Sequence, residues 1–364
     1  MNHYTDFSVA KKILEQAIAA RVFPGAVFGA WHEGNVLVQA VGSFGYEPHW
    51  PVATCDTIYD LASITKVMAT TALAMKLWQD DKFRLETPVC ELLPQFAGDD
   101  PRRAQVTLAM LLAHTSGLPA YRELYLLPEV ASATDAASRR AAIVKAACAT
   151  PLVAEPGARD EYSDIGFLVL GEALAAICGG GLQELYRSTV AAPLGLKTAT
   201  YLPPQSLRAS IAPGCDWRWR HRVIQGEVQD ENCAAMGGVS GHAGLFSNCA
   251  DVLRFATAVL GEGEFFARAT VAKFAQRVSG SRALGWDTPS GRSQSGQYFS
   301  PHSLGHLGYT GTSLWMDLDR RIAIALLTNR CYTGSTAPPL QDREAILQVR
   351  PGFHDAVMRE ILDL

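Results

Sequence analysis

The sequence predicts a mixed α/β (α+β) fold, with an antiparallel-rich sheet formed from both ends of the chain, flanking helices and a helical insertion. Two observations support this class. Alternating or continuous apolar runs indicate strands near both ends, at residues 25–31, 36–42, 312–316 and 322–328. Between these runs, apolar residues recur at helical spacing. Strands at both ends with helices between them favour one shared sheet.

The first elements follow from spacing and turn residues. An opening helix is expected over residues 9–22. Glu33-Gly34-Asn35 is turn-like, so the strands on either side of it should form a hairpin. A strong helix is expected over residues 64–78, because its apolar side chains fall on one face.

Further helices are expected at residues 106–113, 134–147, 165–177, 182–190, 251–260 and 353–362. Thr134 and Asn248 are the expected N-caps of two of them, and Gly179-Gly180-Gly181 should end a third. Asp317 to Arg320 predicts a tight turn between the last two strands. We divide the chain into a discontinuous α/β domain, residues 1–80 and 266–364, and a mainly helical inserted domain, residues 81–265.

Composition excludes several classes of function. The chain has 364 residues, with 32 Lys and Arg against 36 Asp and Glu, and a net charge of −4. This balance argues against a general nucleic-acid or membrane-surface binder, and no apolar run reaches the ~18 residues of a membrane span. The eight cysteines form no Cys-x-x-Cys unit, which argues against a zinc site or a disulfide framework. With no signal peptide recognisable, we expect a cytoplasmic protein, or a periplasmic one if a leader has been removed.

Ser63-Ile64-Thr65-Lys66 lies at the start of the strong helix. Residues i and i+3 share a helix face, so the hydroxyl and the amine can meet. The helix N-terminus adds free N–H groups and a positive dipole end. Ser63 could therefore be a nucleophile whose own N–H is half of an oxyanion hole, with Lys66 helping to take its proton. Alone the motif is weak, because a capping serine with an exposed lysine also produces it.

Two further motifs could complete such a site. Tyr162-Ser163-Asp164 precedes the helix at 165–177, and tyrosine is a credible base only if a cation such as Lys66 lowers its pKa from about 10. The alternative is a helix start with Asp164 as N-cap. Gly305 to Gly311 leads into the strand at 312, where the Tyr309 N–H could be a second oxyanion donor. The alternative there is a glycine-rich hairpin.

The three motifs, in this order, resemble the serine β-lactamase and penicillin-binding-protein superfamily, on the class C β-lactamase and family VIII esterase branch. Further matching segments are residues 111–118, 192–196, 230–232, 237–246, 311–315 and 327–330. The resemblance implies a β-lactamase-like fold with the site between the two parts, and no cofactor or metal. It makes Ser63 the acylated nucleophile, Lys66 its neighbouring amine and Tyr162 the proton shuttle. Whether Lys66 or Tyr162 is the base in acylation stays open.

The resemblance also assigns the groups around the acyl carbonyl. The N–H groups of Ser63 and Tyr309 would hold the tetrahedral intermediate, and Asp164, His306 and Gly308 would line the substrate site. Two residues depart from the family pattern. Asp164 stands where Asn is usual, and could pair with Lys66 and hold it charged. His306 stands where Lys is usual, and is mostly neutral at pH 7. Both changes weaken a site for a substrate carboxylate.

Other candidates carry less weight. Residues 215–222 interleave aromatic and basic side chains, which we interpret as a loop near the cleft rather than a nucleic-acid platform. His114 and His242 are expected to be structural, each a buried imidazole bonded to a backbone carbonyl. Asp230 to Asn232 could line the cleft or cap a helix, and both alternatives stay open.

We therefore predict a serine hydrolase that cleaves small carboxylic esters or amides through an acyl-enzyme on Ser63. The alternatives are a D-aminoacyl peptidase or carboxypeptidase, a weak class C-like β-lactamase, and a non-catalytic acyl-binding sensor or scaffold. The expected partner is a small-molecule substrate, with neither nucleic acid nor membrane, and the oligomeric state stays open.

Overall fold

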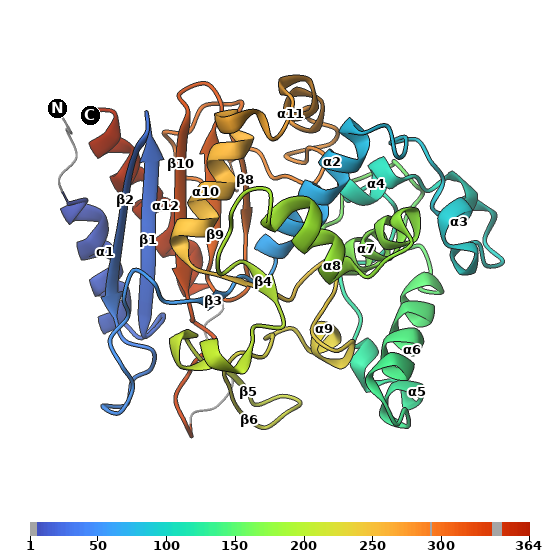
Figure 1. Cartoon of the computed structure of the whole chain (residues 1–364), viewed down its shortest axis with the longest axis horizontal. Helices are drawn as coiled ribbons and strands as arrows, with labels where there is room; N and C mark the ends of the chain where they lie inside the picture. Colours follow the sequence, from blue (N-terminus) through green and yellow to red (C-terminus); the bar gives the residue numbers. More distant parts are fainter. Residues whose placement is uncertain (1–5, 292, 337–343) are drawn as a thin grey trace.

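A five-stranded sheet joins the two ends of the chain in the computed structural model, which describes residues 6–291, 293–336 and 344–364 (Figure 1). The strand order is β2-β1-β10-β9-β8, and every neighbouring pair is antiparallel. The expected sheet from both ends is confirmed. Its strands are β1 (Gly25–His32), β2 (Asn35–Gly42), β8 (Leu304–Leu307), β9 (Ser313–Asp317) and β10 (Ile322–Thr328).

Helices cover both faces of this sheet. α1 (Ser8–Ala19) and α12 (Ala345–Ile361) pack together on one face, over Phe28 and Ile324. α10 (Cys249–Val259) packs against β1 and β10 on the other face. The period-2 alternation of the strands sends successive side chains to opposite faces, which explains how buried strands feed two separate apolar clusters. α10 falls within residues 81–265, the range assigned to the inserted domain, although it packs on the sheet. The domain ranges stay a prediction.

A larger helical region lies beside the sheet, at the right of Figure 1. Its central helix is α7, which packs against α4, α6 and the π-helical turn that precedes α2. The described helices of this region are α2 (Ala72–Gln79), α3 (Val89–Leu92), α4 (Leu108–Leu112), α5 (Pro128–Ala131), α6 (Ala136–Cys148), α7 (Asp164–Cys178), α8 (Leu182–Tyr186), α9 (Glu231–Ala235) and α11 (Arg268–Phe274). Two small sheets, β3 (Tyr59–Asp60), β7 (Leu245–Ser247) and β4 (Thr200–Tyr201), and β5 (Gly214–Asp216) with β6 (Arg222–Ile224), lie between the two regions.

The expected helices are present with local differences, and one strand was not expected. The helix expected at 182–190 is α-helical over Leu182–Tyr186 and continues as a π-helical turn, Arg187–Ala191. The strong helix spans residues 64–79 but contains a π-helical turn, Lys66–Thr71. The helix expected to begin at Thr134 is capped by Asp135, whose carboxylate accepts from the Ser138 N–H at 2.8 Å. α12 begins at Ala345 rather than 353. β8 was not expected as a strand, because its glycine and histidine break the apolar pattern.

No single helix within the described ranges is long and apolar enough to cross a membrane. α7 and the segment at residues 182–191 reach that length only as a pair bent by 75°.

Candidate active site

Ser63 lies at the junction between the strand β3 and the helix that begins at residue 64. Ala62, just before it, has a φ of 48°, which is unusual for a residue with a side chain. The Asp60 carboxylate accepts from the Ala62 N–H at 2.8 Å and holds this conformation. The Leu61 and Ser63 carbonyls then accept the N–H groups of residues 64 and 66, so Ser63 is fixed in the first helical turn.

Lys66 and Tyr162 both contact the Ser63 hydroxyl. The fully buried ammonium of Lys66 donates to Ser63 Oγ at 2.9 Å, to Asp164 Oδ1 at 2.6 Å and to the His242 carbonyl at 3.1 Å. Tyr162 Oη donates to Ser63 Oγ at 2.8 Å. All three ammonium protons of Lys66 therefore have an acceptor. The three residues that the sequence separated by up to 99 positions meet at one oxygen.

The charge states of this cluster follow from burial and neighbours. Burial alone would lower the pKa of Lys66, but the Asp164 carboxylate and the Tyr162 phenol outweigh it, so the pKa of Lys66 is raised. Burial raises the pKa of Tyr162 more than Lys66 lowers it. The condition for Tyr162 to act as a base, a pKa lowered by Lys66, is therefore not met. Lys66 is charged and Tyr162 is a neutral phenol.

The Lys66–Asp164 pair that the sequence suggested is present, but Asp164 is not the N-cap of α7. Ser163 caps this helix, because its Oγ accepts from the Gly166 N–H at 2.9 Å. The Ser163 N–H in turn donates to His114 Nδ1 at 3.0 Å. His114 is thus buried and contacts the Tyr162–Asp164 segment, as its structural interpretation required, but its ring accepts from a backbone N–H instead of bonding the expected carbonyl.

His306 lies on β8 with its ring 5.9 Å from that of Tyr162. Its Nδ1 is 2.9 Å from the Leu307 carbonyl. Burial, together with the charges of Lys66 and Arg282, lowers the pKa of His306 well below 6.5, so the ring is neutral. The sequence analysis missed Arg282, whose guanidinium lies 5.5 Å from the Tyr162 ring centre. No motif marks this lone arginine.

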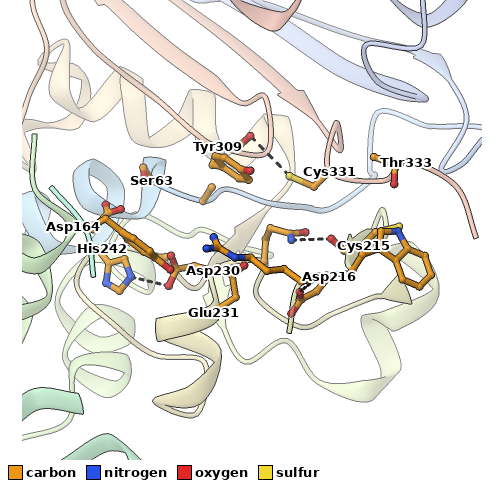
Figure 2. Close-up of a pocket in the computed structure, with 16 residues that line it drawn as sticks. Ser63, Asp164, Cys215, Asp216, Asp230, Glu231, His242, Tyr309, Cys331 and Thr333 are labelled. Atoms are coloured by element: carbon orange, nitrogen blue, oxygen red, sulfur yellow. Dashed lines mark hydrogen bonds and ion pairs between the residues drawn. The ribbon is translucent and has the colours of Figure 1, made fainter. Parts of the chain in front are cut away.

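The turn at residues 308–312 is tied to the segment before Ser63. Thr310 Oγ1 donates to the Asp60 carbonyl at 2.8 Å, and Thr312 Oγ1 donates to the Leu61 carbonyl at 3.0 Å. A Cβ on Gly308 would lie 2.6 Å from the Leu61 carbonyl oxygen, so this approach requires glycine. The arrangement brings Tyr309 to the same side of the pocket as Ser63 (Figure 2).

A cavity of about 390 Å³ opens beside Ser63. Trp217 and Arg218 line it, which confirms that the aromatic and basic loop lies near the cleft. Four acidic residues also line it, and three of them have cationic or histidine partners: Asp164 with Lys66, Asp216 with Arg220, and Asp230 with His242. Glu231, the fourth, forms no ion pair with any described residue. The lining therefore contains four acids against one arginine and one histidine, and burial raises the pKa of Glu231.

Asp230 lines the cavity and also caps a helix, the two roles that the sequence left open. Its carboxylate caps α9 by accepting from the Cys233 N–H at 2.7 Å, and it lies 2.9 Å from His242 Nε2 (Figure 2). His242 Nδ1 is 2.8 Å from Ser240 Oγ, so both ring nitrogens contact side chains, and the expected bond from this ring to a backbone carbonyl is wrong. This residue holds Lys66 through its carbonyl, a contact that sequence alone did not suggest.

Comparison with known proteins identifies the family. The family model described as Beta-lactamase matches residues 10–348. A protein of Escherichia coli (strain K12), named "Putative D-alanyl-D-alanine carboxypeptidase", is 30% identical over 336 residues, covering 84% of this chain and 75% of that protein. A protein of the same name from Salmonella agona is 31% identical over 318 residues, covering 80% and 73%.

Solved structures agree in fold. EstCE1, described as a hydrolase with promiscuous acyltransferase activity, gives a TM-score of 0.75 at 22% identity, covering 95% of this chain and 98% of that one. A class C beta lactamase from Rhodobacter sphaeroides gives 0.72 at 21% identity, covering 98% and 99%. The chain belongs to the beta-lactamase family, within the superfamily of serine β-lactamases and penicillin-binding proteins, and is a serine hydrolase.

Proposed function

We propose that this hydrolase cleaves small carboxylic esters or amides through an acyl-enzyme on Ser63. The observation that carries the proposal is the double contact at Ser63 Oγ, which accepts from both Lys66 and Tyr162 beside an open cavity. The Ser63 hydroxyl is thus within hydrogen-bond distance of an amine that can take its proton once deprotonated, and of a phenol that can donate one, which are the groups that acylation needs. The mutual contacts of all three groups argue against a decayed, non-catalytic sensor.

The charge states favour one proton route. In the resting site Lys66 is charged, so it first passes a proton to Asp164, 2.6 Å away, and the neutral amine then takes the proton of Ser63. Ser63 Oγ attacks the acyl carbon, and the N–H groups of Ser63 and Tyr309 hold the oxyanion. Tyr162, a neutral phenol, gives its proton to the leaving group. Water then hydrolyses the acyl-enzyme by the reverse route.

The cavity supports substrates without a carboxylate. His306 and Gly308, both expected to line the substrate site, are not among the residues that line this cavity, and His306 is buried and neutral. Arg218, an exposed cation of the lining, is paired with Glu123. Glu231 adds an unpaired acid to the described part of the cavity. An anionic substrate would meet repulsion there, whereas a neutral ester or amide would not. Small-molecule turnover in the cytoplasm, without nucleic acid or membrane, remains part of this proposal.

A second candidate, a D-aminoacyl peptidase or carboxypeptidase, is favoured by the names of the Salmonella and Escherichia coli relatives. The test compares kcat/KM for p-nitrophenyl butyrate, a chromogenic cephalosporin and a D-alanyl-D-alanine peptide, with Ser63→Ala as control. We expect the ester to be preferred and its turnover to vanish in Ser63→Ala. A preference for the cephalosporin or the peptide would reject the argument from charge. Turnover that persists in Ser63→Ala would reject the nucleophile.

A further inference from the structure

Arg350, on α12, reaches across to the turn that carries Tyr309. Its Nη2 donates to the Gly308 carbonyl at 2.6 Å and to the Thr312 carbonyl at 2.8 Å, and its Nε donates to the Gly311 carbonyl at 3.2 Å. Nη1 donates to Gln294 Oε1 at 2.8 Å. A single buried guanidinium therefore fixes three carbonyls of one five-residue turn.

The first of these bonds, together with the turn hydrogen bond that the Gly311 N–H donates to the same carbonyl at 3.0 Å, fixes the direction of the Tyr309 N–H. The Gly308 carbonyl and the Tyr309 N–H belong to the same peptide unit, which is trans and planar, so the two groups point in opposite directions. Arg350 is 3% exposed and is not among the residues that line the cavity, whereas Tyr309 and Ser63 both line it. When Arg350 holds the carbonyl on the α12 side, the N–H is directed to the cavity side.

The charge of Arg350 adds to this geometry. Burial, and the nearby Arg330, lower its pKa to about 9, so it remains a cation at neutral pH. Among the described residues, its hydrogen bonds go to carbonyl and amide oxygens and none goes to a carboxylate. A charged donor polarises the peptide that it bonds, which makes the N–H at the other end a stronger donor.

We propose that Arg350 is a positioning residue for the oxyanion hole. It fixes the peptide between Gly308 and Tyr309 with its N–H toward the acyl oxygen, and it places a buried positive charge behind that N–H. This inference rests on the proposed acyl-enzyme at Ser63. Arg350 itself does not touch substrate, so its effect should fall on kcat rather than on KM.

The experiment compares Arg350→Lys and Arg350→Gln with a matched control, Arg103→Lys. Arg103 is also buried and also donates to three carbonyls, those of Phe96, Cys148 and Thr150, but it lies in the helical region away from the cavity. Measurements are kcat and KM for p-nitrophenyl butyrate, the rate at which a fluorophosphonate labels Ser63, and Tm.

We expect kcat and the labelling rate to fall together by about 10- to 100-fold in the Arg350 variants, below the ~10²–10³ that follows complete loss of an oxyanion donor. KM should stay within about threefold, and Arg103→Lys should lower Tm without a comparable loss of kcat. If the Arg350 variants do not fold, Gln294→Leu removes only the side-chain partner of the guanidinium, and it should lower kcat by about two- to fivefold at constant KM.

Each outcome is decisive. An unchanged kcat in a folded Arg350 variant, or in Gln294→Leu when the others do not fold, overturns the inference. An equal loss of kcat in Arg103→Lys overturns it too, because the effect would then be general. A wild-type protein that neither turns over the ester nor is labelled at Ser63 instead overturns the proposed function, and this result is distinct from the others.

Discussion

Asp164→Asn should destabilise the protein in a way that depends on pH. The substitution keeps the shape of the side chain but removes the negative charge 2.6 Å from the buried Lys66 ammonium. At that distance and an effective dielectric constant of about 20, the Coulomb attraction is roughly 6 kcal/mol, which sets a ceiling. The measured cost of breaking a buried pair is about 3–5 kcal/mol. Since Asp164 keeps some exposure, we expect a loss of about 2–4 kcal/mol at pH 7.

The sign of the pH dependence follows from Lys66. In the wild type its pKa is raised, so the pair contributes its full stability below the unfolded value of 10.5 and loses it only as pH rises through the folded value. In the variant, burial is no longer offset by Asp164, so the folded pKa of Lys66 drops below 10.5. The unfolded state then binds more protons, and stability rises with pH. The difference in the free energy of unfolding between the wild type and Asp164→Asn should therefore be smaller at pH 9.5 than at pH 7.

Urea denaturation at the two pH values measures this gap. Glu161→Gln is the control, because Glu161 is a half-buried partner of exposed Arg159 at 2.8 Å and should contribute no more than about 1 kcal/mol. A difference below about 1 kcal/mol for Asp164→Asn at pH 7, or a gap that stays constant with pH, would refute the charge assignment of the pair.

Three other changes test separate parts of the structure. Gly308→Ala places a Cβ 2.6 Å from the Leu61 carbonyl oxygen, so kcat for p-nitrophenyl butyrate should fall by more than about tenfold; wild-type kcat would show that the turn can shift freely. The pKa of buried His354 is lowered to about 3 from 6.5, so the free energy of unfolding should fall by about 2 kcal/mol between pH 7.5 and pH 5. In urea denaturation, His354→Gln should remove this dependence on pH. An equal slope in both proteins would assign it elsewhere. Glu231→Gln should raise kcat/KM for a succinate hemiester several-fold relative to butyrate, and an unchanged ratio would mean that Glu231 does not repel anions.

Regular patterns made most of the sheet predictable. The hairpin of β1 and β2 and the strands β9 and β10 have long apolar or alternating runs, so their bounds differ from expectation by a residue or two. β8 was not predicted as a strand because its four residues include Gly305 and His306, which interrupt the apolar pattern. It is a strand because it pairs with β9. The first turns of α12 were not predicted as helix because Pro351 lies inside it, and proline normally marks a helix boundary.

Some residues of the candidate site could likewise be predicted from the sequence, and others could not. Ser63, Lys66 and Tyr162 belong to motifs, and their contacts follow from those motifs. Arg282, Arg350 and the carbonyl of His242, which contact the site, belong to no motif, because backbone contacts and contacts with ring faces place few demands on neighbouring sequence. Burial, which raises the pKa of Tyr162, is likewise a property of the folded state and could not be deduced from spacing.

The antiparallel pairing of β1 with β10 has a consequence for how the molecule is made. Ala26 pairs with Thr328, 302 positions later in the chain. During synthesis the hairpin of β1 and β2 therefore waits with one edge unpaired until almost the whole chain has left the ribosome. Such non-local pairing carries a large loop-closure cost and slows folding. Ser63, the proposed nucleophile, is translated early, whereas the turn around Tyr309 and the helix α12 that contacts it are translated near the end.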